Sequence, residues 1–283
     1  MSTVVSNVDS QAPLASQKIE MERAGQGIVK KVYRAFFSPA KYEEKSTDHE
    51  IIERGNNYRI PFEGGELAVT TWGEGGPSVL LMHGWGGARA QMTGFVEPLL
   101  NAGYRVVAYD QPAHGESDGK TTNLLEIAPT MDLIVKQEGK FEAIIAHSFG
   151  TLITSYALVK RHVQPPARLV YFGAFNRLMD SLPRFQVLAG LPDEIADGLR
   201  RMIYDHFGKD VVEAIANEEL APQIHVPALM FHDVTDNVTP IADSRAIVKA
   251  WTGAELIETS GLNHRGALQS KEVHERIVSF LRS

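Results

Sequence analysis

The chain has 283 residues, which fits one large α/β domain, or one domain with an insertion, and is long enough to bury a sizeable core. Its net charge of −7 disfavours nucleic acid and anionic membranes as partners, and the absence of cysteine excludes disulfides, a thiol nucleophile and thiolate metal sites. No apolar run approaches the roughly 20 residues of a membrane span, and the first residues lack the basic and apolar regions of a secretory signal. These features predict a cytoplasmic protein that acts on a neutral small molecule.

Residues 1–48 are expected to form an N-terminal extension. Within it, residues 19–38 carry Ile28, Val32 and Phe36 at roughly helical spacing, which predicts an amphipathic helix interrupted near the glycines at 25 and 27. Because its aromatic face would otherwise be exposed, we expect this helix to cover the core, a second subunit or a membrane surface. A homodimer in which this helix packs on the second subunit is therefore one of the expected possibilities.

The next part of the chain reads as strands and then as alternating strands and helices. Extended segments are expected at His49–Glu53, Tyr58–Phe62 and Leu67–Trp72, with a glycine pair at 64 and 65 as the hairpin turn between the last two. Further strand-like runs lie at 78–82, 105–109, 143–146, 168–172, 228–231 and 255–258, and helical stretches lie near 89–101, 124–137, 149–161, 241–251 and 271–281. Alternation of this kind predicts an α/β fold with a mostly parallel, eight-stranded sheet and helices on both faces.

The interval 176–223 separates two strands by more than a single crossover helix needs, so we expect an insertion there. Ile195, Leu199 and Ile203 fall on one helical face within it. The predicted organisation is a core made of residues 49–175 and 224–283, with a small helical cap from 176–223. The cap should cover the carboxyl edge of the sheet, where ligands bind in open α/β folds.

The stretch "AHSFG", residues 146–150, places Ser148 between a predicted buried strand and a predicted helix. A turn that sharp needs small residues two positions before and after the serine, and Ala146 and Gly150 supply them. The pattern is G-x-S-x-G with alanine in place of the first glycine. Taken alone, it also fits a serine that caps the following helix.

Four more motifs follow predicted strands: "HGWGG" (83–87), "YDQPAHGES" (109–117), "FHDVTDNVTP" (231–240) and "SGLNHRG" (260–266). Together with "AHSFG" they resemble, in type and order, the α/β-hydrolase fold family over about residues 50–283. The family's order of serine, acid and histidine implies a triad of Ser148, Asp236 and His264. Asp236 is preferred to Asp233 because only Asp236 is followed four residues later by proline, as in the family.

The resemblance also assigns the neighbouring residues. His83, His114 and Asp110 are expected to be structural, and His147 is the competing candidate for the histidine. The family's oxyanion donors correspond to the backbone N–H groups of Trp85 and Phe149. The substrate pocket is expected to be lined by Trp85, His147, Phe175, Leu178, Met179 and Leu182.

A serine hydroxyl is a poor nucleophile at neutral pH, so an imidazole must take its proton and a carboxylate must fix the imidazole tautomer. The resemblance therefore implies a serine hydrolase that cleaves carboxylic esters of short to medium acyl chain through an acyl-enzyme. No cofactor or metal is implied, since H-E-x-x-H and phosphate-loop patterns are absent. An acyltransferase, a carbon–carbon bond hydrolase or a perhydrolase would use the same triad, and a non-catalytic ligand-binding member of the fold is a further alternative.

Overall fold

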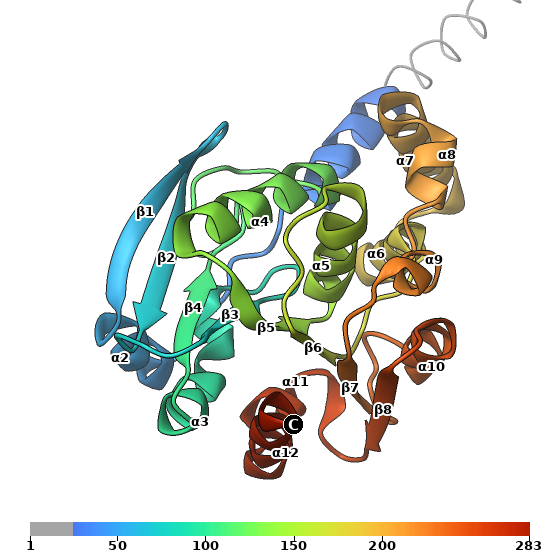
Figure 1. Ribbon diagram of the computed structural model, residues 1–283. Helices are drawn as coiled ribbons and strands as arrows, with labels where there is room; N and C mark the ends of the chain where they lie inside the picture. Colours follow the sequence, from blue (N-terminus) through green and yellow to red (C-terminus); the bar gives the residue numbers. More distant parts are fainter. Residues whose placement is uncertain (1–24) are drawn as a thin grey trace, which may run out of the picture.

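A computed structural model of the protein describes residues 25–283. An eight-stranded sheet forms its centre, in the order β1-β2-β4-β3-β5-β6-β7-β8 (Figure 1). β2 pairs antiparallel with β1 and β4, whereas the other neighbours pair in parallel, which confirms the predicted mostly parallel sheet. The strands are β1 (Asn56–Phe62), β2 (Gly65–Trp72), β3 (Ser78–Met82), β4 (Arg105–Tyr109), β5 (Phe141–His147), β6 (Arg168–Phe172), β7 (Ala228–Asp233) and β8 (Ala254–Thr259).

Helices cover both faces of the sheet, so the central strands are buried on both sides. The helices around the sheet are α2 (Ser46–Glu53), α3 (Val96–Asn101), α4 (Leu124–Glu138), α5 (Phe149–Lys160), α10 (Ile241–Ala250), α11 (Asn263–Gly266) and α12 (Lys271–Arg282). Alternate residues of β3 belong to different cores: Leu80 and Met82 pack with α4, α5 and α10, and Val79 and Leu81 pack with α2, α3 and α12. No helix within residues 25–283 combines the length and apolarity needed to cross a bilayer.

The prediction that His49–Glu53 is extended is wrong, because these residues belong to α2. The helix buries Asp48 and Ile52, which are four residues apart, a spacing that fits one face of a helix and one face of a strand equally well. Asp48 fixes the helix to the core by accepting a hydrogen bond of 3.0 Å from the hydroxyl of Thr93. A short segment with only two buried positions fits both the helical period of 3.6 residues and the strand period of two residues.

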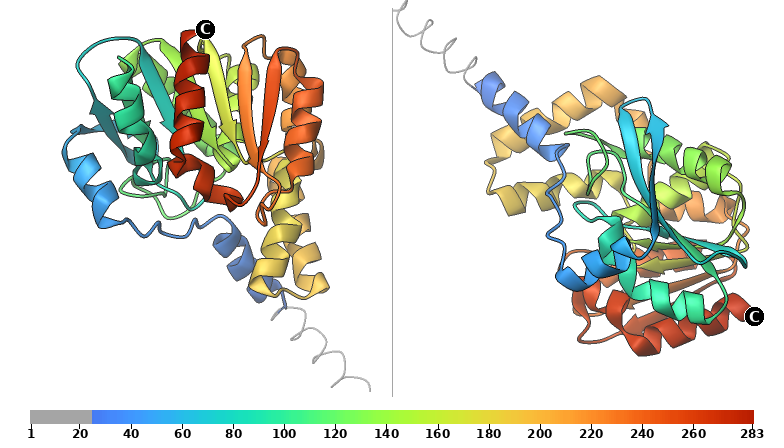
Figure 2. Two further views of the ribbon diagram at one scale, coloured as in Figure 1. Left: turned by 90° about the horizontal axis from the view of Figure 1, so that it is seen from below. Right: turned by 90° about the vertical axis from the view of Figure 1, so that its left-hand side faces the viewer.

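Between β6 and β7 the chain forms short helices that lie together beyond one end of the sheet (Figure 2). The segment contains α6 (Ser181–Ala189), α7 (Asp193–Phe207), α8 (Lys209–Glu213) and α9 (Asn217–Leu220). The longest, α7, has an apolar stripe that includes Leu199 and Ile203, and both side chains are buried. The division of the chain into extension, core and cap stays a prediction.

The N-terminal helix packs against these short helices, as both views of Figure 2 show. Its described part is residues 25–36, and the expected residues before 25 lie outside the described part of the chain. The helix continues through Gly27 without the predicted interruption. The ring of Phe36 lies 5.2 Å from that of Phe185 in α6, and a Cβ atom on Gly198 in α7 would come within 2.7 Å of Val29.

Candidate active site

Ser148 occupies a strained turn between β5 and α5. Its φ of 52° and ψ of −123° lie in a region that residues with a Cβ atom rarely adopt. Its N–H donates to the carbonyl of Phe172 at 2.8 Å, which ties the turn to β6. A Cβ atom on Gly150 would lie 2.5 Å from the carbonyl oxygen of His83, and Ala146 is fully buried. The small residues on either side therefore let strand and helix pack closely enough to form the turn.

Asp236 and His264 are brought together from the loops after β7 and β8. The Nδ1–H of His264 donates to Oδ2 of Asp236 at 2.7 Å, and the two side chains are 9% and 1% exposed. Burial alone would raise the pKa of Asp236, but the nearby ring of His232 and the hydrogen bond from His264 outweigh it, so the pKa lies well below its ordinary value. The carboxylate thus stays charged at neutral pH. It holds the proton of His264 on Nδ1 and leaves Nε2 free to accept another.

Two residues that support this pair were missed in the sequence. A Cβ atom on Gly173, whose φ is 48°, would lie 3.1 Å from Nδ1 of His264 and 3.2 Å from Oδ2 of Asp236. His232 donates from Nε2 to the carbonyl of Thr239 at 2.9 Å, and the same nitrogen lies 3.4 Å from Oδ2 of Asp236. The signal for His232 was its place four residues before Asp236 in the same motif.

Asp233 has a separate role. Its carboxylate accepts hydrogen bonds from the N–H and hydroxyl of Thr235 at 2.9 and 2.5 Å, from the hydroxyl of Thr259 at 2.9 Å and from the N–H of Leu262 at 2.8 Å. Burial alone would raise its pKa, but these bonds hold the pKa well below the usual range. Asp233 therefore joins the loop after β7 to the loop that carries His264.

The loop 83–87 lies directly against Ser148. A Cβ atom on Gly84 would come within 2.9 Å of the Cβ of Ser148. Among residues 25–283, no hydrogen-bond acceptor takes the N–H of Trp85 or of Phe149, the two expected oxyanion donors. His83 anchors the loop, since its Nδ1–H donates to the carbonyl of Gly84 at 2.8 Å, and burial lowers its pKa to about 4.

Asp110 and His114 make hydrogen bonds that hold neighbouring loops. Asp110 accepts from the N–H groups of Arg89 at 2.6 Å and Glu116 at 2.9 Å, and His114 donates from Nδ1 to the carbonyl of Pro112 at 2.9 Å. Both are buried, and both lie in the chain segment that follows β4. These contacts are the kind of structural bonds that the sequence predicted for them.

His147, the alternative candidate for the triad histidine, forms a hydrogen bond to the backbone of His264. Its Nε2–H donates to the carbonyl oxygen of His264 at 3.0 Å, and the two rings lie 4.7 Å apart. Burial lowers the pKa of His147 to about 3, so the ring is neutral. The contact links the strand before Ser148 to the loop that carries His264.

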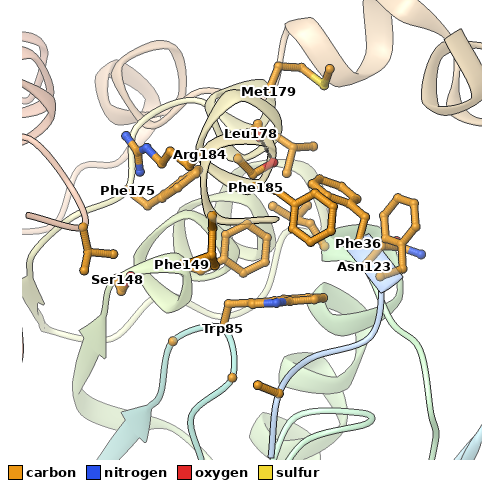
Figure 3. Close-up of a pocket in the computed structure, with 18 of the residues that line it drawn as sticks. Phe36, Trp85, Asn123, Ser148, Phe149, Phe175, Leu178, Met179, Arg184 and Phe185 are labelled. Atoms are coloured by element: carbon orange, nitrogen blue, oxygen red, sulfur yellow. Dashed lines mark hydrogen bonds between the residues drawn. The ribbon is translucent and has the colours of Figure 1, made fainter. Parts of the chain in front are cut away.

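Ser148 and His264 both line one cavity of about 870 Å³. In Figure 3 it leads from Ser148 past the rings of Phe149 and Trp85 to Phe36 and Phe185. Of the predicted pocket residues, Trp85, His147, Phe175, Leu178 and Met179 line it.

Leu182 was also predicted to line the pocket, but it is not among the lining residues. It is 1% exposed and packs in the cluster between α6 and α7, with Leu199, Ile203 and Val212. Phe36 of the N-terminal helix and Phe37 directly after it line the cavity instead, and neither was predicted to do so.

A family model described as "Alpha/beta hydrolase family" matches residues 79–276. The chain belongs to the α/β-hydrolase family. The matched segment runs from β3 into α12 and contains Ser148, Asp236 and His264. The family resemblance found in the five motifs is thereby confirmed.

Relatives of this α/β-hydrolase include a non-heme haloperoxidase from Rhodococcus erythropolis, which is 23% identical over 273 residues, covering 78% of this chain and 97% of the relative. Among solved structures, an esterase from Exiguobacterium antarcticum is similar with a TM-score of 0.62 and 19% identity over 80% of this chain and 99% of the esterase. An esterase from Pyrococcus furiosus has a TM-score of 0.64 and 20% identity, over 87% and 97% of the two chains. At this identity the structural matches show the shared fold.

Proposed function

We propose that this α/β-hydrolase cleaves carboxylic esters of short to medium acyl chain through an acyl-enzyme on Ser148. The observation that supports this most is that Ser148, on its strained turn, and His264, bonded to Asp236 at 2.7 Å, line the same cavity. A nucleophile, a base and a group that orients the base are the requirements of acyl transfer through serine.

In the first half of the proposed reaction, Oγ of Ser148 attacks the ester carbonyl while Nε2 of His264 takes its proton. Asp236 stabilises the imidazolium, and the N–H groups of Trp85 and Phe149 donate to the carbonyl oxygen as it gains charge. The bond between the acyl carbon and the alcohol oxygen then breaks. The alcohol leaves with the proton from His264, and the acyl group stays on Ser148.

In the second half, His264 takes a proton from a water molecule, whose oxygen attacks the acyl carbon. The bond from the acyl carbon to Oγ breaks, Ser148 regains the proton from His264, and the carboxylic acid leaves. Each oxyanion donor contributes on the order of 3–4 kcal/mol to such a reaction.

The shape of the cavity supports the choice of acyl chain. Its volume of about 870 Å³ is near the upper end of the range for small-molecule sites, roughly 300–1,000 Å³. Phe149 and Phe175 line the part near Ser148, and Phe36 and Phe185 lie at the far end (Figure 3). Each methylene buried along these rings contributes about 0.8 kcal/mol, close to fourfold in kcat/KM, until the chain reaches the far pair.

A second candidate is transfer of the acyl group to hydrogen peroxide, which the haloperoxidase relative favours. Peroxide would replace water in the second half of the reaction, so the acyl carbon would leave Oγ of Ser148 for a peroxide oxygen and a peracid would form. The two functions share the acyl-enzyme and differ only in the acceptor.

A panel of p-nitrophenyl esters of increasing acyl length, assayed with and without hydrogen peroxide, tests both functions. We expect kcat/KM to rise over short and medium chains and then fall, with carboxylic acid as the main product. Peracid as the main product would favour the second candidate. Failure to cleave any ester would contradict both, and would leave a carbon–carbon bond hydrolase or a ligand-binding protein.

A further inference from the structure

The cavity that contains Ser148 carries fixed charge of one sign. Among the described residues that line it, the arginines are Arg184 and Arg265, and there is no aspartate, glutamate or lysine. The chain as a whole has a net charge of −7, which favoured a neutral substrate. The cavity is therefore opposite in sign to the chain around it, and an anionic group that enters it meets positive charge.

Arg184, in α6, lies at the catalytic end of the cavity with its charge partly neutralised. Its Nη2–H donates to Oδ2 of Asp243 at 3.0 Å, and its guanidinium lies 4.6 Å from the centre of the ring of Phe175. Figure 3 shows this guanidinium beside Phe175, on the side of the cavity where Ser148 lies. Because Asp243 already binds Arg184 and its Nη1 is buried, Arg184 adds positive potential but has little capacity left to bind a ligand.

Arg265, in α11, is the arginine of the cavity that remains available. It is exposed, and within residues 25–283 no carboxylate forms an ion pair with it. By contrast Arg245, another exposed arginine, donates to both carboxylate oxygens of Glu258 at 2.7 and 2.8 Å. Burial lowers the pKa of His147, and the positive charge of Arg265 acts in the same direction, so the guanidinium lies near the ring that packs on His264. Arg265 is thus accessible, unpaired and close to the triad.

The two ends of the cavity suit different parts of an ester. Phe36 and Phe185 at the far end suit the acyl chain (Figure 3). In the proposed reaction the alcohol leaves with the proton of His264, so the alcohol part of the ester lies beside that ring. Arg265 is the next residue and lines the same cavity, and the Cα atoms of consecutive residues are about 3.8 Å apart. A charged group on the alcohol is therefore within reach of its guanidinium.

We propose that Arg265 binds an anionic group on the alcohol part of the substrate, so that esters of alcohols bearing a carboxylate or a phosphate are preferred to esters of neutral alcohols. The planar guanidinium presents parallel N–H donors that match two oxygens of either anion. Arg184 adds attraction from the cap side of the cavity. The inference rests on the proposed esterase function and defines the alcohol that it releases.

The size of the preference follows from the exposure of Arg265. Water and salt screen a guanidinium in solvent, so this ion pair changes kcat/KM by less than a buried one. With two parallel N–H donors on the anion and the added potential of Arg184, we expect a preference of about fivefold or more at low ionic strength. The preference should shrink as salt is added, which an effect of shape or size would not do.

Esters of one acid with matched alcohols test the site. 4-Butyryloxybutanoate carries a carboxylate, 4-butyryloxybutanamide carries a neutral amide of nearly the same shape, and 3-butyryloxypropyl phosphate carries a phosphate. Each is assayed with the full chain at about 10 mM and about 300 mM sodium chloride. Cleavage of p-nitrophenyl butyrate, which has no anionic group, is measured in parallel.

Arg265→Gln is compared with Arg161→Gln as the control. Arg161 follows α5 at the end opposite to Ser148, is exposed and does not line the cavity. The two variants lose the same charge and gain the same amide, so a difference between them reports the position of the charge and not the net charge. The preference is a ratio of two kcat/KM values from one preparation, so a fraction of misfolded protein does not alter it.

We expect the unsubstituted chain and Arg161→Gln to prefer at least one anionic ester to the amide by about fivefold or more at low salt, and Arg265→Gln to lose that preference. A preference for the carboxylate alone or the phosphate alone supports the site and identifies the anion. Equal kcat/KM for the anionic esters and the amide in the unsubstituted chain would overturn the site and leave the esterase function intact.

Other results would also overturn the site. A preference that survives in Arg265→Gln, that disappears equally in Arg161→Gln, or that salt does not weaken would show that Arg265 does not bind the anion. Cleavage of p-nitrophenyl butyrate without cleavage of either anionic ester would do the same. Failure to cleave all four esters would overturn the proposed function and the site together.

Discussion

Replacing Asp236 by asparagine should reverse the hydrogen bond that orients His264. Oδ1 of Asp236 accepts the N–H groups of Val238 at 2.8 Å and Thr239 at 2.9 Å, so the amide oxygen of the variant keeps that position. The NH₂ group then takes the place of Oδ2, which lies 2.7 Å from Nδ1 of His264. Two donors cannot face each other, so the imidazole adopts the tautomer with its proton on Nε2 and can no longer accept the proton of Ser148.

We expect kcat of Asp236→Asn to fall by about 10³- to 10⁴-fold, which corresponds to roughly 4–5.5 kcal/mol in the activation barrier. The assay is hydrolysis of p-nitrophenyl butyrate at saturating substrate and neutral pH. The circular dichroism spectrum of the variant must match that of the unsubstituted chain, so that the loss is not a loss of folded protein.

Asp233→Asn is the matched control, because Asp233 also follows β7 but bonds to Thr235, Thr259 and Leu262 rather than to a histidine. Its kcat should fall less than about tenfold, while its free energy of unfolding falls by about 1–3 kcal/mol through the weakened loop contacts. A larger loss of kcat in Asp233→Asn than in Asp236→Asn would refute the assignment and make Asp233 the acid.

Three further predictions follow from other contacts. Phe36→Ala should lower the free energy of unfolding by about 1–2 kcal/mol, which is less than for a fully buried ring, and should move the optimal acyl length upward. Urea unfolding measures the first effect and the ester panel measures the second. If neither changed, Phe36 would not be a wall of the cavity. Burial lowers the pKa of His83 to about 4 and those of His114 and His147 to about 3. Below pH 6.5, the approximate pKa of a histidine in the unfolded chain, the unfolded chain therefore binds more protons than the folded chain. As the pH falls, the free energy of unfolding should decrease by about 1.4 kcal/mol per pH unit for each histidine, until the folded chain is protonated near pH 3–4. Unchanged urea midpoints between about pH 7 and 5 would contradict this. His147→Phe should lower kcat about 10- to 100-fold, because the carbonyl of His264 loses its hydrogen-bond donor. His147→Gln keeps an N–H group near the position of Nε2, so its kcat should stay close to that of the unsubstituted chain. Equal losses of kcat in the two variants would show that the hydrogen bond does not position His264.

The sequence predicted the parts of the fold that depend on local pattern. The alternation of strand and helix patterns predicted the mostly parallel sheet. The small residues on either side of Ser148 predicted the sharp turn, in which the φ of Ser148 is 52°. The segment around Ile52 was assigned wrongly because its buried positions are four residues apart, which suits a helix and a strand alike.

The contacts that shape the candidate site depend on tertiary packing, which the periodicity of one segment does not contain. The apolar face of the N-terminal helix was visible, but not that Phe36 would reach the same cavity as Ser148. Leu182 was assigned to the pocket because it is apolar and in the insertion, whereas α6 turns it toward α7.

Reaction of the chain with a fluorophosphonate, followed by intact mass and peptide mapping, tests the role of Ser148 most directly. A serine activated by His264 and Asp236 should take up one adduct, on Ser148, and lose esterase activity in step with labelling. Ser148→Ala should remain folded, stay unlabelled and show kcat lower by about 10⁴- to 10⁶-fold. An adduct on another residue, or undiminished ester turnover in folded Ser148→Ala, would contradict the proposed mechanism.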